Sequence, residues 1–171
     1  MNISKYLKLA VIFVAALSLN ACGGGGGGGS TSGGTTGGTT GGVTSATTQA
    51  YKLVLKGTFA ASAVKGLQFD LVFPSGVTLN IDSANSAVLA SSLGLSGLAP
   101  SEALLASKFS ASTLSAGILT TAGLSAGEFA TITCNIDAGV AVPAASSLVV
   151  SNVKAIDTKD AALSGVSVSV N

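Results

Sequence analysis

The chain has 171 residues, of which 9% are charged: eight Lys, no Arg, and seven Asp or Glu. It contains neither His nor Trp. A near-neutral charge without Arg excludes the basic face that a nucleic-acid binder needs. The lack of His removes the usual general base and the commonest metal ligand, and few charged groups remain for acid–base chemistry. The composition therefore predicts a protein that is not an enzyme and that needs no cofactor and no metal.

The first 22 residues have the three zones of a secretory leader. Residues 1–8 are basic, with Lys5 and Lys8, and residues 9–19 are apolar except for Ser18. A helix over the apolar zone is roughly 16 Å long, about half of the ~30 Å hydrocarbon core of a bilayer. We therefore predict a cleaved leader and not a membrane-spanning helix.

The motif Leu19-Asn20-Ala21-Cys22 ends this leader. It resembles the lipobox of bacterial lipoprotein signal peptides, although Asn is a less common second residue there. The resemblance implies that residues 1–21 are removed and that Cys22 becomes the lipidated first residue, held on the bilayer by three acyl chains where two already anchor stably. Gly23 in the next position implies sorting to the outer membrane. The alternative is an ordinary secretory leader with a coincidental Cys.

A tether is expected after Cys22. Residues 23–42 contain only Gly, Ser and Thr, and residues 43–49 are similar in character. Such a segment has nothing to bury, so we predict a disordered linker over residues 22–49, with a reach of roughly 30 Å. A glycine-rich phosphate loop is the alternative, but such loops lie between a strand and a helix with a Lys at a fixed offset, and these features are missing.

Residues 50–171 are predicted to form one all-β domain. Apolar and polar residues alternate with the period of half-buried strands, over residues 52–56, 66–73, 77–81, 130–136, 148–156 and 166–170. Turn residues separate these stretches, at 74–76, 122–123, 125–127, 138–139 and 157–160. The pattern indicates an antiparallel β-sandwich, and on periodicity alone Greek-key, jelly-roll and immunoglobulin-like strand orders all remain open.

The stretch over residues 83–108 has no clear period. Within it, residues 101–106 could form one helical turn, because Ser101 is a good N-cap residue and Pro100 stands just before it.

The order of motifs in residues 50–171 resembles cohesin domains. The sequence GLQFDLVFPSGV at residues 66–77 is similar to their early strand pair, in which a glycine precedes an alternating strand, a short turn and a second strand. Residues 117–119 and 125–133 resemble a later strand pair, and residues 148–157 and 166–170 resemble the final hairpin.

The cohesin resemblance implies a nine-stranded jelly-roll sandwich related to some carbohydrate-binding modules. Cohesins bind a calcium-loaded dockerin partner through one sheet face and belong to polysaccharide-degrading assemblies. This domain is shorter than a usual cohesin, and the indistinct residues 83–112 cover strands that cohesins use for binding. No partner-contact residue is therefore carried over.

The seven carboxylates are expected at the surface or in turns. Two of them could in principle form a glycosidase pair, which needs a separation of about 5–10 Å. The turn Asp157-Thr158-Lys159-Asp160 could be a calcium site, but calcium needs about six to eight oxygens, so a solvated turn is the simpler interpretation. The full set is Asp70, Asp82, Glu102, Glu128, Asp137, Asp157 and Asp160.

Cys134 lies between Ile132 and Ile136 on an apolar row, and we predict a small buried hydrophobe and not a reactive thiol. Phe69 and Phe73 lie on another apolar row and are expected in the core. A sugar-stacking platform would normally use Trp or Tyr, so the aromatic residues give direct glycan binding little support.

Together these features predict an exported lipoprotein that is anchored to the cell envelope and displays a non-catalytic module for a protein partner. Under the cohesin resemblance that partner carries a dockerin. Docking would use a sheet face with polar rows of Ser, Thr and Asn. Two alternatives remain: direct binding of a polysaccharide, and a structural envelope protein without a specific ligand.

Overall fold

The computed structural model describes residues 46–171, which contain nine strands and one 3-10 turn. The predicted leader, the lipidation site Cys22 and most of the predicted linker lie outside the described residues. The elements are β1 (Thr47–Lys56), β2 (Val64–Val72), β3 (Val77–Thr78), β4 (Leu93–Leu95), β5 (Leu104–Ser110), β6 (Thr113–Leu124), β7 (Gly127–Ile136), the turn η1 (Ala145–Ser147), β8 (Val149–Ile156) and β9 (Ser167–Val170).

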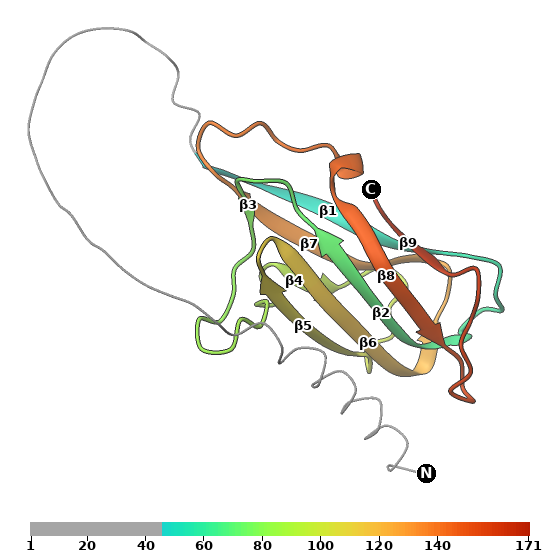
Figure 1. The fold of residues 1–171 in the computed structure, drawn as a ribbon. Coiled ribbons are helices and arrows are strands. Elements are labelled where there is room, and N and C mark those ends of the chain that lie inside the picture. Colours follow the sequence, from blue (N-terminus) through green and yellow to red (C-terminus); the bar gives the residue numbers. More distant parts are fainter. Residues whose placement is uncertain (1–45) are drawn as a thin grey trace, which may run out of the picture. The chain divides into compact units, whose positions relative to one another are not determined.

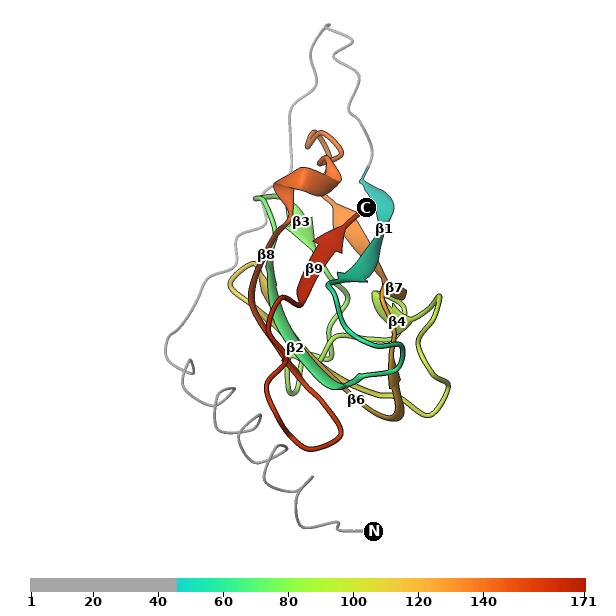
Figure 2. The ribbon, with the colours of Figure 1, turned by 90° about the vertical axis from the view of Figure 1, so that its right-hand side faces the viewer.

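The strands form two antiparallel sheets, which confirms the predicted antiparallel sandwich (Figure 1). One sheet has five strands. Four of them follow the order β3-β7-β1-β9, and the fifth, β4, also pairs with β7. The other sheet has the order β5-β6-β2-β8. Figure 2 shows the sheets facing each other, with β2 and β8 in one layer and β1 and β7 in the other.

The core consists of the inward rows of both sheets. Leu53 and Leu55 of β1 are fully buried, as is Phe69 of β2. Phe69 meets Phe129 of β7 edge to face, with ring centroids 5.9 Å apart, an arrangement that aromatic pairs favour. Burial of each such side chain stabilises the fold by about 1.5–3 kcal/mol. The prediction that Phe69 and Phe73 lie in the core is confirmed.

A β-bulge gives Phe129 its place in the core. Leu53 pairs with Ala130 and Val54 pairs with Glu128, so Phe129 is an extra residue in β7 without an opposite partner. Both Phe129 and Ala130 are buried. The bulge therefore brings two consecutive side chains of one strand into the core, which strict alternation would not allow.

The expected helical turn over residues 101–106 is wrong, because β5 begins at Leu104. β5 pairs with β6 from Leu104 to Ser110, and Leu105 and Phe109 pack against the core. The period of two in β5 is hard to detect in the sequence. Leu104 is apolar but faces outward, and Ala106 and Ser107 are both small.

Three boundaries also differ from the expectation. β1 begins at Thr47 and not at Lys52, because residues 47–51 already pair with β7. β3 ends at Thr78, and Ile81 forms an isolated bridge with Val88. Residues 122–123 are not a turn between strands but an irregularity within β6, where Gly123 adopts a φ of +87°.

Gly123 and Gly165 offer a matched pair of substitutions. Both have positive φ, but a side chain at Gly123 would collide with the backbone carbonyl of Ser62, whereas Gly165 has open space around it. Gly165→Ala is expected to lower the free energy of unfolding by about 1–2 kcal/mol, because alanine disfavours the left-handed backbone conformation. Gly123→Ala should lower the free energy of unfolding by roughly 1–3 kcal/mol more, because the β1–β2 connection must shift. Urea unfolding followed by far-UV circular dichroism measures both, and equal losses would contradict the close approach.

Candidate binding face

The outward side chains of the sheet β5-β6-β2-β8 form one surface, which we call the four-strand face. Successive residues of a strand point to opposite sides of the sheet, so the register of the strands defines the rows of this surface. In the order β5, β6, β2, β8 the rows are Ser110, Thr113, Val72 and Val149; Lys108, Ser115, Asp70 and Ser151; Ala106, Gly117, Gln68 and Lys154; Leu104, Leu119, Gly66 and Ile156.

This face is polar in the middle and apolar at both ends. The first row exposes Val72 by 39% and Val149 by 57%, and these two residues are direct partners across β2 and β8. The last row exposes Leu104 by 71%. Along a strand the two end rows are roughly 20 Å apart. Small residues such as Ser115 make up half of the two middle rows, and Lys108, Asp70, Gln68 and Lys154 make up the rest. The surface thus offers apolar contacts on both sides of a polar centre.

A second β-bulge lies at the edge of the four-strand face. Gln68 pairs with Lys154 and Asp70 pairs with Ser151, so β8 has one residue more than β2 over this interval. Asn152 lies in the bulge with a φ of +52°, and its Nδ2 donates a hydrogen bond of 2.7 Å to Asp70 Oδ2. A non-glycine residue in this conformation costs about 1–2 kcal/mol, and such strain is often found at functional positions.

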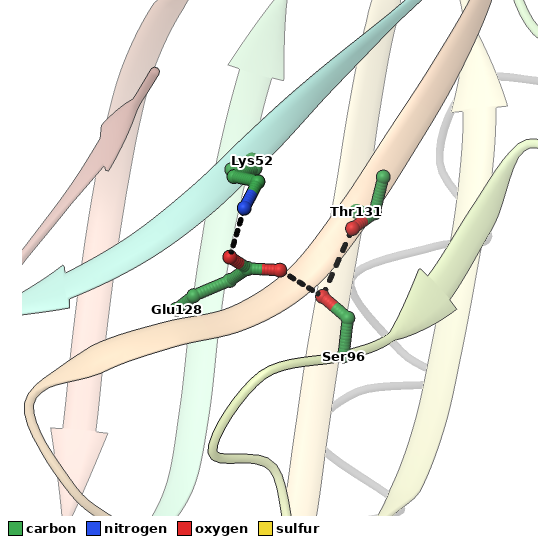
Figure 3. Close-up of polar contacts among 4 residues, drawn as sticks. All are labelled: Lys52, Ser96, Glu128 and Thr131. Carbon is green, nitrogen blue, oxygen red and sulfur yellow. Dashed lines mark hydrogen bonds and ion pairs between the residues drawn. The ribbon is translucent and has the colours of Figure 1, made fainter.

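On the outer face of the other sheet, four polar side chains form one connected network (Figure 3). Lys52 Nζ lies 2.8 Å from Glu128 Oε2, and Ser96 Oγ donates to Glu128 Oε1 at 2.8 Å. Ser96 Oγ also lies 2.9 Å from Thr131 Oγ1. The hydrogen bonds from Lys52 and then Ser96 lower the pKa of the Glu128 carboxyl. The side chains of Lys52, Ser96 and Glu128 are thus engaged with one another.

Two further carboxylates, those of Glu102 and Asp157, hold loops in place. Glu102 Oε1 accepts hydrogen bonds from Thr120 Oγ1 at 2.8 Å and from the Ala122 amide at 2.9 Å. These bonds, the one from Thr120 first, lower the pKa of Glu102. Asp157 Oδ1 accepts the amides of Ala161 and Lys159, and both bonds lower its pKa.

The described part of the chain contains no cluster of potential metal ligands. Within residues 46–171, no group of three or more His, Cys, Asp or Glu side chains could hold a metal ion. In the turn at 157–160, Asp157 directs Oδ1 to its own backbone amides, as in a self-capped turn. The contacts of Asp157 thus favour the solvated turn over the calcium site.

Cys134 is fully buried in the core, which confirms the prediction of a small buried hydrophobe. Desolvation raises the pKa of its thiol to about 12, so the reactive thiolate is scarce at neutral pH. The six aromatic side chains of the described residues are all buried or partly buried, so none forms an exposed platform for a sugar ring.

No protein family model, no curated protein and no solved structure matches the chain significantly. Among residues 46–171, no helix has the length and apolar character needed to cross a bilayer.

Sequence reasoning did not find the residues of the four-strand face as a group. The alternation around Phe69 placed Gln68 and Asp70 outward, but it could not show which strands lie beside β2. Asn152 was missed as well, although an Asn in the middle of an apolar strand is a signal for a bulge.

The hydrogen bonds of Glu102 predict a pH-dependent stability. Its folded-state pKa is lowered, so its contribution is fully present above the unfolded-state value of roughly 4.3 and is lost as the pH falls through the folded-state value. Glu102→Gln should therefore lower the free energy of unfolding near neutral pH, and the difference from the wild type should shrink in acid. Urea titrations at several pH values measure this difference. A difference that does not change with pH would show that charge plays no part.

Proposed function

We propose that the protein is a non-catalytic binding module that docks a protein partner on its four-strand face. The observation that carries this proposal is the contrast between the two outer faces. The four-strand face exposes Val72, Val149 and Leu104 around a polar centre, whereas Glu128 and Lys52 on the other face are already engaged with each other. Apolar anchors beside a polar surface are typical of protein interfaces.

The charges of this face indicate the chemistry of the partner. Lys108 and Lys154 lie on its two edge strands, and Asp70 is the single acidic residue in its rows. Asp70 already accepts a hydrogen bond from Asn152. The net charge of the four-strand face is therefore positive, which favours a partner surface with carboxylates near its centre.

The cohesin resemblance supports a more specific partner class. The number of strands and their antiparallel pairing in two sheets agree with the fold that the resemblance implies. On that basis the partner is a dockerin-bearing protein, and the pair serves in polysaccharide degradation. Direct polysaccharide binding is less well supported, because all aromatic residues of the described part of the chain pack in or against the core.

The position of Thr47, the first residue of β1, agrees with a domain that is displayed on a linker. Thr47 pairs with Ile136, which also pairs with Val77 just after the β2–β3 turn. The linker therefore joins the sandwich at the end where this turn lies, and not in the middle of a sheet. A lipid on Cys22 and a Gly/Ser/Thr linker would present the domain at the outer membrane.

Two Arg substitutions of equal size test the docking face. Ser115→Arg places a bulky cation in the middle of the four-strand face, and Thr133→Arg places the same group on the outer face of the other sheet. With the chain immobilised in extract from the cells that produce it, we expect Ser115→Arg to reduce capture of a defined partner at least about tenfold, and Thr133→Arg to leave capture unchanged. Parallel runs with and without calcium test the dockerin assignment, which requires calcium.

Each outcome of the capture experiment has a distinct meaning, provided that circular dichroism shows both variants folded. Equal capture by both variants would place the partner elsewhere on the domain. A chain that captures nothing specific would favour the structural envelope protein. Retention on insoluble glycans that survives Ser115→Arg would favour direct polysaccharide binding by another surface.

Replacement of the lipidation site tests the anchor separately. Cys22→Ser should move the protein from the membrane fraction to the soluble fraction, since acyl chains on this residue supply the membrane affinity. Mass spectrometry of the wild-type protein should find Cys22 acylated at the amino terminus. An unmodified Cys22, or a Cys22→Ser protein that stays with the membranes, would contradict lipidation.

A further inference from the structure

β1 is the strand that receives the chain from the linker, and it is bonded along both edges. It pairs with β7 over nine residues, from Thr47 to Leu55. On its other edge it pairs with β9 over four residues, from Leu53 to Lys56. The amide of Lys52 donates to Asn171 O at 2.8 Å, and the Asn171 amide donates back at 2.9 Å.

A pull on the linker acts along the length of β1. The hydrogen bonds of an antiparallel ladder are perpendicular to the strands, so a force along the strand loads all of them at once and cannot open them one by one. Thr47 is the first residue of this ladder, which means that tension from the linker enters β1 in this shear geometry.

Side chains of β1 strengthen its attachment to the rest of the sandwich. Tyr51 Oη donates a hydrogen bond of 2.6 Å to the carbonyl of Pro143 in the β7–β8 connection. Lys52 forms an ion pair with Glu128 of β7. Leu53 and Leu55 are fully buried between the sheets. Removal of β1 therefore breaks backbone bonds, polar side-chain contacts and core packing together.

The carboxyl-terminal strand is attached far less strongly. β9 spans only Ser167–Val170, and within the described residues its one strand partner in the sheet is β1. A pull on Asn171 has to break the short β1–β9 ladder, the two bonds to Lys52 and the core packing of Val168 and Val170. The two ends of the domain thus differ in the number of bonds that share a load.

We infer that the sandwich is a load-bearing module with a preferred direction: it resists tension that enters through β1 and leaves through the four-strand face. The inference rests on the proposed function for its biological role, because a partner docked on that face supplies the opposing pull. The mechanical asymmetry itself follows from the strand pairing and needs no partner. The kind of partner that fits is one fixed to a large or insoluble object while the linker is held at a membrane.

Single-molecule force spectroscopy tests this inference on one protein with two pulling geometries. The chain carries Cys22→Ser and Ser115→Cys, so that one handle is coupled to the introduced thiol in the four-strand face, while Cys134 is protected by burial. The second handle is attached either to the linker before residue 46 or after Asn171. We expect the first rupture force to be about twofold or more higher for the linker pull than for the carboxyl-terminal pull, since more bonds are loaded together.

The comparison separates geometry from stability, because the same sequence is pulled in both experiments and should show the same thermal unfolding midpoint with either handle. Equal forces, or a weaker linker pull, would overturn the inference even if Ser115→Arg abolishes capture of a partner. A higher rupture force for the linker pull, in a protein that captures no partner, would support the mechanical asymmetry. It would contradict only the proposed docking.

Discussion

The contact between the two sheets is the constraint on which the other features of the domain depend. Phe69 of β2 and Phe129 of β7 meet edge to face across the core. Phe129 is the extra residue of the β-bulge in β7, and the bulge lets its side chain point into the core. Once these inward positions are filled, the period of two leaves the alternate residues of β2 and β7 outward. The polar rows of both outer faces are thus a consequence of how the core is packed.

The two sheets use their outward residues differently. In the sheet of β1 and β7, Lys52 and Glu128 form an ion pair, and Ser96 joins them from the segment after β4. In the other sheet, the outward positions carry small side chains, two apolar end rows and a carboxylate oriented by Asn152. Surface ion pairs contribute little to stability, so the network of the first face matters mainly because it leaves few groups unsatisfied.

Much of the fold could be predicted from alternation, and the failures have physical causes. Leu67, Phe69 and Leu71 alternate clearly with polar residues, so β2 was predictable. β5 was not, because Leu104 faces outward and Ala106 and Ser107 carry almost no hydropathy signal. The four-strand face is a property of register, which depends on contacts between residues far apart in the chain. The bulge at Asn152 adjusts that register locally, and single-residue patterns do not encode it.

The proposed docking face and β1, the strand that follows the predicted linker, lie in different sheets. Outward substitutions on β2 and β6, such as those at Gln68 or Ser115, alter the four-strand face but touch none of the pairs that hold β1 between β7 and β9. Substitutions at distant, independent sites act additively on stability. The outward residues of the four-strand face can therefore change while the core and the pairing of β1 stay as they are. The reverse is not true, because a change at Leu53 would disturb both the core and the pairing of β1 with β7.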